Sequence, residues 1–507
     1  MSFLHISNLS FKYQSSITPI FSSVNLTLSE DWFALIGPNG CGKTTLLNII
    51  ANKIEPDLGE ISPKLSTYLC QQDTLLDIPE FFYSPDLINL PETNKILSKL
   101  EIKDDWTWRW DNLSGGEKKR CMIADAIIRK PEVLLIDEPA NHLDIYSMDL
   151  LSNELKNYKG IGIIISHDLT FLDNICTKTI MIESTKGGNQ VIIYDCKPSI
   201  ALEQRDKTIN YLKDQKSAQI KKIEHLKKIK NNEMQTIQAS KNRLSKKNVS
   251  AKDFSTKSKI DGARLSSKDK KPGQRLSSVN KEISRNTQKL NNLIVYESRK
   301  TGVDLSGSKE KSNFILDLEK DTISLIENTL ELQHPNLIIT PEDRIILTGN
   351  NGAGKTTFIK YLYNLLENKN KSFWYLPQEF TQQDRIDIKN KILNLDKEKQ
   401  AEIFSIVFRL GSNPTSIMNS DLISPGEAQK LLYGLAIISK ASLLILDEPT
   451  NYLDILSINS LIDALNNFNG AIIAVTHDRS FSKAIGKKNW NLIRNENLTI
   501  LEENDII

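Results

Sequence analysis

Short apolar runs recur in two parts of the chain and predict buried strands. The runs are near-continuous rather than alternating, which is typical of strands covered on both faces of a parallel sheet. Helical patterns separate them, so we expect an α/β fold in two halves, placed at residues 1–198 and 305–507. The predicted strand segments are Phe33–Ile36, Val133–Ile136, Ile161–Ile165, Ile345–Leu347, Leu443–Leu446 and Ala471–Val475.

The segment between the halves, residues 199–304, follows a different pattern. Apolar residues stand at approximate helical spacing among lysines, over 209–229 and again over 276–294. Between these stripes, residues 241–273 are rich in Ser, Lys and Asn and end at Pro272–Gly273, a helix-breaking pair. We expect a helical-hairpin linker with its tip at about 241–273, the first helix having about 35 residues and a length of about 50 Å. A disordered, solvated linker is the alternative interpretation.

The two halves repeat the same short motifs in the same order. Four pairs of motifs recur at offsets of 310 to 312 residues, which indicates the duplication of one domain. The pairs are GPNGCGKTT (37–45) and GNNGAGKTT (349–357), LSGGEKKR (113–120) and ISPGEAQK (423–430), LLIDEPANHLD (134–144) and LILDEPTNYLD (444–454), and IIISHD (163–168) and IAVTHD (473–478).

Charge is distributed unevenly along the 507 residues. The formal net charge of the whole chain is +2, yet residues 201–300 hold 26 Lys/Arg against 10 Asp/Glu, a net charge of +16. The remaining residues hold a net charge of −14. A basic segment between two acidic halves points to a polyanionic partner.

The composition also argues against several protein classes. No apolar run approaches the roughly 18–20 residues that a membrane-spanning helix needs, so no direct membrane contact is expected. The first residues lack the basic and then apolar pattern of a signal peptide. The five cysteines are scattered without a C-x-x-C pair, which favours a reducing cytosol and argues against a zinc or iron–sulfur site. We therefore expect a cytoplasmic protein.

Each half carries a glycine-rich loop between a predicted strand and a predicted helix. In that context, backbone amides surround phosphate oxygens at a helix N-terminus. We expect Lys43 and Lys355 to reach the β- and γ-phosphates of a nucleotide, and Thr44 and Thr356 to ligate Mg²⁺. The expected nucleotide-binding residues are Gly37, Asn39, Gly40, Gly42, Lys43, Thr44 and Thr45 in the first loop, and Gly349, Asn351, Gly352, Gly354, Lys355, Thr356 and Thr357 in the second.

Two acidic residues end one predicted strand in each half. Asp137 and Asp447 are expected to lie near Mg²⁺, and the next residues, Glu138 and Glu448, to polarise the attacking water. A solvated acidic loop is the alternative for one such pair. Because the sequence D-E-P occurs twice at a matched distance from a phosphate loop, we interpret both glutamates as catalytic.

The motifs LSGGE, DEPANHLD and SHD resemble the signature, the Walker B motif with its D-loop, and the switch histidine of ABC-type ATPases. The resemblance implies ATP and Mg²⁺ as cofactors, and composite sites in which two nucleotide-binding domains pair head to tail. It implies that Tyr13 stacks on adenine. Site one would combine Lys43, Thr44, Gln71, Asp137, Glu138 and His167 with Ser424 and Gly426. Site two would combine Lys355, Thr356, Gln378, Asp447, Glu448 and His477 with Ser114, Gly115 and Gly116.

Two positions depart from that family pattern. Pro425 replaces the first signature glycine, which removes a backbone N–H and fixes φ. A tolerated variant and a slower site one are both open interpretations, and we expect both sites to hydrolyse ATP. No aromatic residue equivalent to Tyr13 precedes the second phosphate loop, which puts adenine stacking there in doubt.

Two such domains joined by a basic helical insert resemble the ABC-F family, and the compact remainder resembles its antibiotic-resistance (ribosomal protection) branch of the Vga/Lsa type. The resemblance implies a monomer with intramolecular domain pairing that enters the tRNA exit site of the bacterial 70S ribosome. Its linker would contact ribosomal RNA and P-site tRNA near the peptidyl-transferase centre and protect against lincosamides, streptogramin A compounds and pleuromutilins. The expected RNA-binding tip residues are Lys246, Lys247, Phe254, Lys257 and Lys259.

Three other functions can be compared with this one by the charge of the linker and the pattern of cysteines. A housekeeping ABC-F translation factor is the main alternative, and the sequence separates it only weakly from resistance. An ABC transporter subunit would have little reason for a linker with a net charge of +16. A DNA-repair ATPase of the UvrA type would carry zinc-binding cysteine pairs. The sequence does not choose between direct drug clash and reshaped RNA as the mode of protection.

Overall fold

The computed structural model forms two compact units. Residues Met1–Ala201 and Arg299–Ile507 make the first, here called the core unit, and Leu202–Ser298 make the second, the helical unit. The predicted boundaries at 198/199 and 304/305 stay predictions. The structure describes residues 2–14, 18–71, 78–88, 90–139, 143–185, 188–243, 270–292, 313–326, 330–350, 352–420, 422–495 and 498–505.

The first half of the core unit is built on a nine-stranded sheet in the order β4-β1-β2-β9-β8-β3-β7-β6-β5. Strands β5, β6, β7, β3 and β8 run parallel in that order, and β1 pairs antiparallel with β2 and β4. The strands are β1 Phe3–Phe11, β2 Phe21–Ser29, β3 Trp32–Ile36, β4 Leu58–Ser62, β5 Thr67–Cys70, β6 Val133–Asp137, β7 Ile161–Ile165, β8 Lys178–Thr185 and β9 Gly188–Tyr194.

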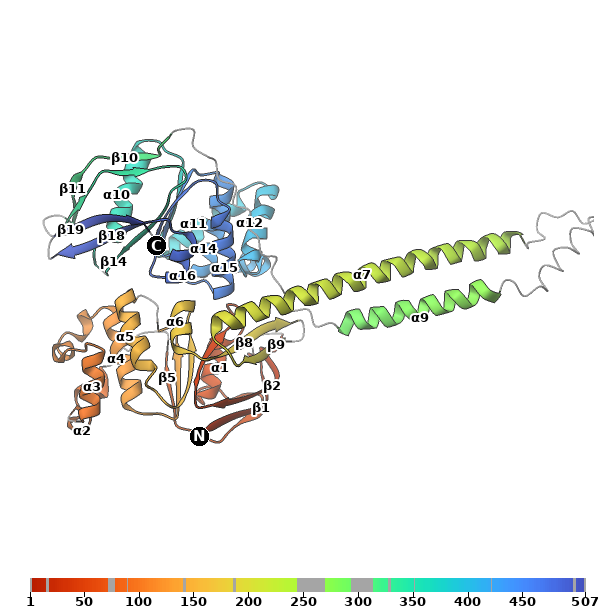
Figure 1. Ribbon diagram of the computed structural model, residues 1–507, viewed down its shortest axis with the longest axis horizontal. Coiled ribbons are helices and arrows are strands. Elements are labelled where there is room, and N and C mark those ends of the chain that lie inside the picture. The colour runs from red at the N-terminus through yellow and green to blue at the C-terminus, as the bar shows by residue number, and fades with distance from the viewer. Residues whose placement is uncertain are drawn as a thin grey trace, which may run out of the picture. The chain divides into compact units, whose positions relative to one another are not determined.

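Helices alternate with the parallel strands of this half, as Figure 1 shows. Three short 3₁₀ helices, at Glu80–Phe82, Asp104–Thr107 and Trp110–Asn112, accompany them. The α-helices are α1 Lys43–Ile50, α2 Pro85–Ile88, α3 Pro91–Lys99, α4 Gly115–Ile128, α5 Ile145–Leu155 and α6 Leu169–Ile175.

The second half repeats the plan with an eight-stranded sheet, β11-β12-β19-β18-β14-β17-β16-β15, and a separate pair, β10 and β13. The strands are β10 Leu316–Leu318, β11 Asp321–Ile326, β12 Leu330–His334, β13 Leu337–Ile339, β14 Arg344–Gly349, β15 Phe373–Leu376, β16 Leu443–Asp447, β17 Ala471–Val475, β18 Lys488–Asn495 and β19 Leu498–Asp505. The helices are α10 Lys355–Asn368, α11 Gln382–Leu393, α12 Lys397–Arg409, α13 Pro414–Asn419, α14 Pro425–Ser439, α15 Ile455–Asn466 and α16 Arg479–Ile485.

The predicted strand segments all lie in the parallel part of the two sheets, and the α/β class is confirmed. Every residue of β3, β6, β7, β16 and β17 is buried, which explains why their sequences are apolar without alternation. In the second half, separate apolar clusters cover the two faces of the sheet, one around α12 and α14 and the other around α10. The strands therefore end at fixed positions within a packed frame.

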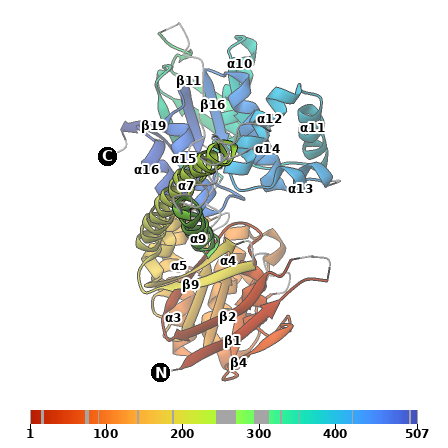
Figure 2. The same ribbon diagram turned by 90° about the vertical axis from the view of Figure 1, so that its right-hand side faces the viewer.

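The helical unit contains two long helices that lie side by side, α7 Pro198–Arg243 and α9 Lys270–Asn292 (Figures 1 and 2). Lys222 pairs with Glu282 at 3.7 Å, and Glu233 pairs with Arg275 at 3.9 Å, so the helices are antiparallel. Ile223 in the predicted stripe is buried. The helical hairpin is thus confirmed over its described part.

Two details of the hairpin prediction were wrong. Helix α7 has 46 residues rather than about 35, because it already begins at Pro198, where proline suits the first turn. The Ser199 amide there donates to Asp173 Oδ1 on α6 at 3.0 Å. Pro272–Gly273 does not end the tip: α9 begins at Lys270, and a proline in the first turn removes an N–H that has no intrahelical partner.

The five predicted tip residues, Lys246, Lys247, Phe254, Lys257 and Lys259, lie outside the described residues. Along the described chain, no helix combines the length and the apolar character needed to cross a membrane.

Candidate functional site

The two phosphate loops have nearly the same conformation. Gly40 and Gly42 have φ values of 78° and 99°, and their counterparts Gly352 and Gly354 have 79° and 95°. Such angles are open to glycine and strained for other residues. In each half the loop joins a buried parallel strand to a helix whose N-cap is the last glycine, so unpaired helix amides face the loop.

Both loop lysines lie back across their own loops. Lys43 Nζ donates to the carbonyl of Gly37 at 2.9 Å, and Lys355 Nζ to that of Gly349 at 2.8 Å. Lys355 is half-buried, and this burial lowers the pKa of its ammonium. A polyphosphate beside a partly desolvated ammonium would be strongly attracted. Asn351, predicted for the second loop, lies outside the described residues.

The predicted magnesium ligands are brought together at the carboxyl ends of β6 and β16. Thr44 Oγ1 donates to Asp137 Oδ2 at 2.8 Å. In the second half, both carboxylate oxygens of Asp447 are buried, and neither has a partner at hydrogen-bonding distance among the described residues. Burial raises the pKa of Asp447 to about 6, although the nearby Thr356 side chain acts in the opposite direction. A buried carboxylate beside a hydroxyl fits Mg²⁺, which prefers few protein ligands plus phosphate oxygens.

The Q-loop residues follow the neighbouring strands. Gln71 comes directly after β5 and is exposed, and Gln378 comes two residues after β15 and is half-buried. Because β5 pairs with β6 and β15 with β16, both glutamines lie at the same sheet edge as the aspartates. The described residues contain no cluster of three or more His, Cys, Asp or Glu that would hold a metal without phosphate oxygens.

The two candidate catalytic glutamates are held in an unusual backbone conformation. Glu138 and Glu448 have φ values of 51° and 48°, and their amides donate to the carbonyls of Ile165 and Val475, both at 2.9 Å. Non-glycine residues at positive φ carry strain that the surrounding structure must hold, and they cluster at functional sites. Each glutamate is thereby fixed to the strand that precedes its switch histidine.

The glutamate and histidine of each half face each other at different distances. His167 Nε2 is 2.9 Å from Glu138 Oε1, whereas His477 Nε2 is 3.7 Å from Glu448 Oε1. Burial raises the pKa of Glu448 to about 8 and lowers that of His477 to about 4. Burial thus disfavours the charged form of both side chains in this pair.

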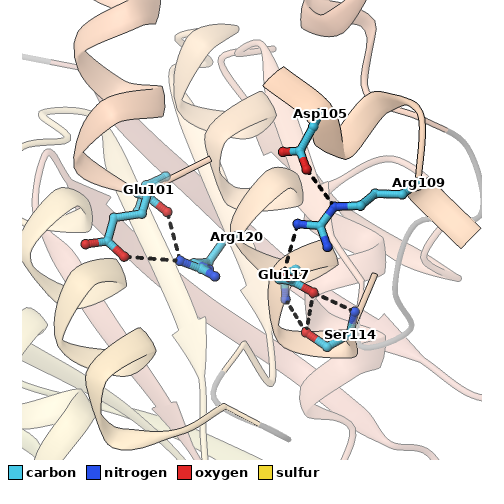
Figure 3. Close-up of polar contacts among 7 residues, drawn as sticks. Glu101, Asp105, Arg109, Ser114, Glu117 and Arg120 are labelled. Carbon is cyan, nitrogen blue, oxygen red and sulfur yellow. Dashed lines mark hydrogen bonds and ion pairs between the residues drawn. The ribbon is translucent and has the colours of Figure 1, made fainter. Parts of the chain in front are cut away.

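Each signature serine caps the helix that follows it. Ser114 and Ser424 occupy the N-caps of α4 and α14, and each forms a reciprocal capping box with the glutamate three residues on. Figure 3 shows the first signature, where Arg109 Nε lies 3.0 Å from Asp105 Oδ2 and Arg109 Nη2 lies 4.0 Å from Glu117 Oε1. These contacts tie the start of α4 to the short helix before it.

Pro425 sits at the first position of α14, where a proline does not disturb the helix. The two N-cap serines have similar backbone angles, with φ of −62° and ψ of 157° at Ser114 and φ of −68° and ψ of 159° at Ser424. The cap is therefore preserved, and the change is confined to one missing amide.

Loops of one half meet the phosphate loop of the other. The Asn39 amide donates to Asp454 Oδ2 at 2.8 Å, and Asn39 Nδ2 donates to the carbonyl of Tyr452 at 2.9 Å. A Cβ added at Gly426 would lie 3.2 Å from that same Tyr452 carbonyl. The second signature and the D-loop that follows β16 thus adjoin the first phosphate loop. At the other site, burial lowers the pKa of Lys355, and the negative charge of Asp144 partly offsets this, as a nearby carboxylate would.

Sequence reasoning missed some of these residues. Asp144, Asp454 and Tyr452 stood inside a quoted motif without a role, because only the fold shows that they face the opposite half. Arg494 Nη1 donates to the carbonyl of Gly352 at 2.9 Å, and no motif marked it. The Tyr13 hydroxyl lies 3.1 Å from Thr45 Oγ1 of the first phosphate loop, and its stacking on adenine stays a prediction.

Comparisons with known proteins agree with this architecture. A family model described as ABC transporter matches residues 21–141 and 332–451. The erythromycin resistance ATP-binding protein MsrA of Staphylococcus epidermidis is 29% identical over 482 residues, covering 90% of this chain and 91% of its own. The ribosome protection protein VmlR of Bacillus subtilis (strain 168) is 26% identical over 491 residues, covering 94% and 84%.

A solved structure shows the same fold. In the crystal structure of archaeal ribosomal stalk protein aP1 with archaeal ribosome recycling factor aABCE1, the matching chain aligns with a TM-score of 0.60 at 15% identity, covering 97% of this chain and 89% of that one. The duplicated phosphate loops and acidic strand ends define a tandem ABC-type ATPase, an ATP hydrolase. Within that class, the chain is similar over most of its length to MsrA and VmlR, as expected for a protein that resembles the ABC-F family.

Proposed function

We propose that this protein is a cytoplasmic, ribosome-associated ATPase that protects the bacterial 70S ribosome from antibiotics. The observation that carries the proposal is a hairpin of two antiparallel helices, in a segment of net charge +16, joined to two ATPase halves. Such a rod suits a polyanion, because lysine contacts to phosphates release counterions and read shape rather than sequence.

ATP and Mg²⁺ bind at two composite sites in this proposal. Lys43 and Lys355 leave their loop carbonyls to contact phosphates, while Asp137 and Asp447 lie toward the metal with the neighbouring threonines. Mg²⁺ supplies neutralisation of phosphate charge. The glutamates that follow orient the attacking water and accept its proton, and the switch histidines hold those glutamates.

The nucleotide state controls ribosome binding. ATP closes the two halves, and the closed form enters the tRNA exit site with the linker extended toward the peptidyl-transferase centre, beside P-site tRNA. Hydrolysis opens the halves and releases the ribosome. Because ATP and the ribosome both favour the closed form, each tightens the binding of the other.

The names of two relatives support the resistance role: one is an erythromycin resistance protein and the other a ribosome protection protein. We propose lincosamides, streptogramin A compounds and pleuromutilins as the drugs. The five lysine and phenylalanine residues of the predicted tip are the proposed RNA contacts.

Co-sedimentation with 70S ribosomes tests the proposal. The double variant Glu138→Gln, Glu448→Gln binds ATP without hydrolysing it, so we expect it to pellet with ribosomes in ATP and to stay in the supernatant in ADP. Lys43→Ala with Lys355→Ala in the same background is the matched control, because it removes ATP binding and with it retention.

Expression in a drug-susceptible bacterium then separates resistance from general translation. Raised minimum inhibitory concentrations for the three drug classes support protection. Ribosome binding without any change in susceptibility would instead identify a translation factor. A folded, ATP-bound double variant that ignores ribosomes would refute the ribosome partner itself.

A further inference from the structure

The first turns of the two helices that follow the switch histidines, α6 and α16, meet each other in the core unit. Thr170 Oγ1 lies 2.8 Å from Ser480 Oγ, and these residues are counterparts, 310 positions apart. Asp168 and Asp478 cap the helices α6 and α16 at this contact, and each accepts the amide three residues on. The contact is therefore close to two-fold symmetric in its backbone and capping residues.

One ion pair breaks this symmetry. Arg479 Nη2 lies 2.7 Å from Asp149 Oδ2, with side-chain exposures of 35% and 49%. The residues at the equivalent positions are Leu169 and Asn459, which carry no charge. The second half thus contributes an arginine to the contact, and the first half contributes its carboxylate, with no counterpart on the other side.

Both ends of this ion pair belong to site two. Arg479 comes two residues after His477, the switch histidine that faces Glu448. Asp149 lies on α5, whose N-cap residue Asp144 is close enough to Lys355 for their charges to interact. The pair therefore joins the switch of one half to the D-loop helix of the other at the same nucleotide site.

Site one is held by other contacts. There Asn39 bonds to Asp454 and Tyr452, and His167 is already within 2.9 Å of its glutamate. In site two the histidine and glutamate are 3.7 Å apart, so a productive hydrogen bond requires the switch loop to move closer. A charge anchored beside that loop can direct this movement.

We propose that Arg479 is a positioning residue for ATP hydrolysis at site two. Its ion pair with Asp149 holds the switch loop of the second half against the D-loop helix of the first, so that His477 is directed at Glu448 when the halves are closed. Hydrolysis at site two depends on this charge pair, and hydrolysis at site one does not. The inference rests on the composite sites proposed above.

The test measures the two sites separately. Arg479→Leu, which copies the residue at position 169, is placed in a Glu138→Gln background, where site two alone hydrolyses ATP, and in a Glu448→Gln background, where site one alone does. We expect kcat to fall about two- to fivefold at site two, the range for a partly exposed ion pair, with KM unchanged. The site-one rate should stay within error.

Two further variants identify the pair itself. Asp149→Asn, which copies position 459, should reproduce the loss, and combining it with Arg479→Leu should add nothing further. Charge reversal, Arg479→Asp with Asp149→Arg, should restore part of the site-two rate. High salt should shrink the difference between Arg479→Leu and its parent, because the pair is partly solvent-exposed.

Vanadate trapping with a photoreactive azido-ATP gives a readout with both glutamates intact. Arg479→Leu should reduce labelling of peptides from the second phosphate loop only. Equal losses at both sites would mean that Arg479 merely holds the halves together, and no loss at either would show that the pair is idle; both results overturn the proposal. Parents that keep the wild-type rate would instead refute the glutamate assignment.

Discussion

Pro425 illustrates how a single residue can change a site without changing its frame. Ser424 keeps its capping box, and only one backbone amide is lost. We predict that Pro425→Gly alters hydrolysis at site one, measured in a Glu448→Gln background, by less than about twofold. A missing hydrogen bond to a charged phosphate would be worth about 1.5–3 kcal/mol, or about ten- to 150-fold in rate, so a gain of that size would contradict this prediction.

Gly115→Pro is the matched control for Pro425→Gly. A Cβ at position 115 meets nothing within 4 Å, and the extended backbone of Ser114 suits a following proline. This variant should fold normally and keep the site-two rate, measured in a Glu138→Gln background, within about twofold as well.

Asp478 is a second residue with a measurable consequence. Burial, together with the nearby Asp168, raises its pKa from 3.8 to about 7. Between these two pH values the folded chain holds a proton that the unfolded chain has lost, so stability falls as pH rises. Asp478→Asn keeps the helix cap and removes this titration. We predict that the melting temperature of the variant, relative to wild type, is higher at pH 8 than at pH 5.

Asp396→Asn provides the comparison for Asp478→Asn. Asp396 also caps a helix, α12, but it is exposed and its amide contacts lower its pKa. It is therefore ionised at both pH 5 and pH 8, and its variant should show the same melting difference at each pH. An equal difference for Asp478→Asn would contradict a raised pKa at that residue.

At the scale of elements, the basic face of α7 is accessible to a partner. Lys221, Lys227 and Lys228 are exposed along the described part of this helix. We predict that replacing all three by Gln weakens ribosome co-sedimentation and reduces the slope of log affinity against log salt by up to about three, since each phosphate contact contributes about one. Glutamine has nearly the helix propensity of lysine, so the helix should remain.

The same substitution at Lys53, Lys64 and Lys95, three exposed lysines of the core unit, is the charge-matched control. Equal effects from the two triple variants would show that net charge, rather than the helix, attracts the ribosome. A salt slope unchanged in both would contradict a phosphate partner for the hairpin.

Elements differed in how well their sequences predicted them. The strands β6 and β16 were found because full burial leaves an uninterrupted apolar run, and the phosphate loops because glycine alone accepts their angles. The start of α7 was missed because its first turns interrupt the lysine-rich stripe. Pro272–Gly273 was interpreted as a helix-breaking pair, but it lies in the first turn of α9, and a proline breaks a helix only beyond the first turn. The role of Arg479 depends on a contact with the other half, which local pattern does not encode.

At the scale of the whole molecule, α6 connects the switch motif to the first turn of α7. It begins just after the switch motif with Asp168 as its cap, contacts the other half through Thr170, and accepts the Ser199 amide through Asp173. We predict that Asp173→Ala leaves ATP hydrolysis by the isolated protein within about twofold, and weakens ATP-dependent ribosome retention by about two- to tenfold, the worth of one hydrogen bond.

Asp214→Ala, which removes an equal charge from the exposed surface of α7, should leave both measurements unchanged. Loss of basal hydrolysis in Asp173→Ala would show that the residue supports the site rather than the linker. Full ribosome retention would show that the root of α7 is held by other contacts.

The hydrogen bond between Ser199 and Asp173 joins a short helix to a long one, so a small rotation at this contact would move the far end of α7 by a larger distance. Helix α6 has seven residues and α7 has 46, so the ratio of the two arms is about 6.6 at a common rise per residue. A stiff rod about 69 Å long moves its free end by about 1.2 Å for each degree of tilt at its base. By that ratio, a displacement of about 0.3 Å at the far end of α6 would correspond to about 2 Å at the free end of α7.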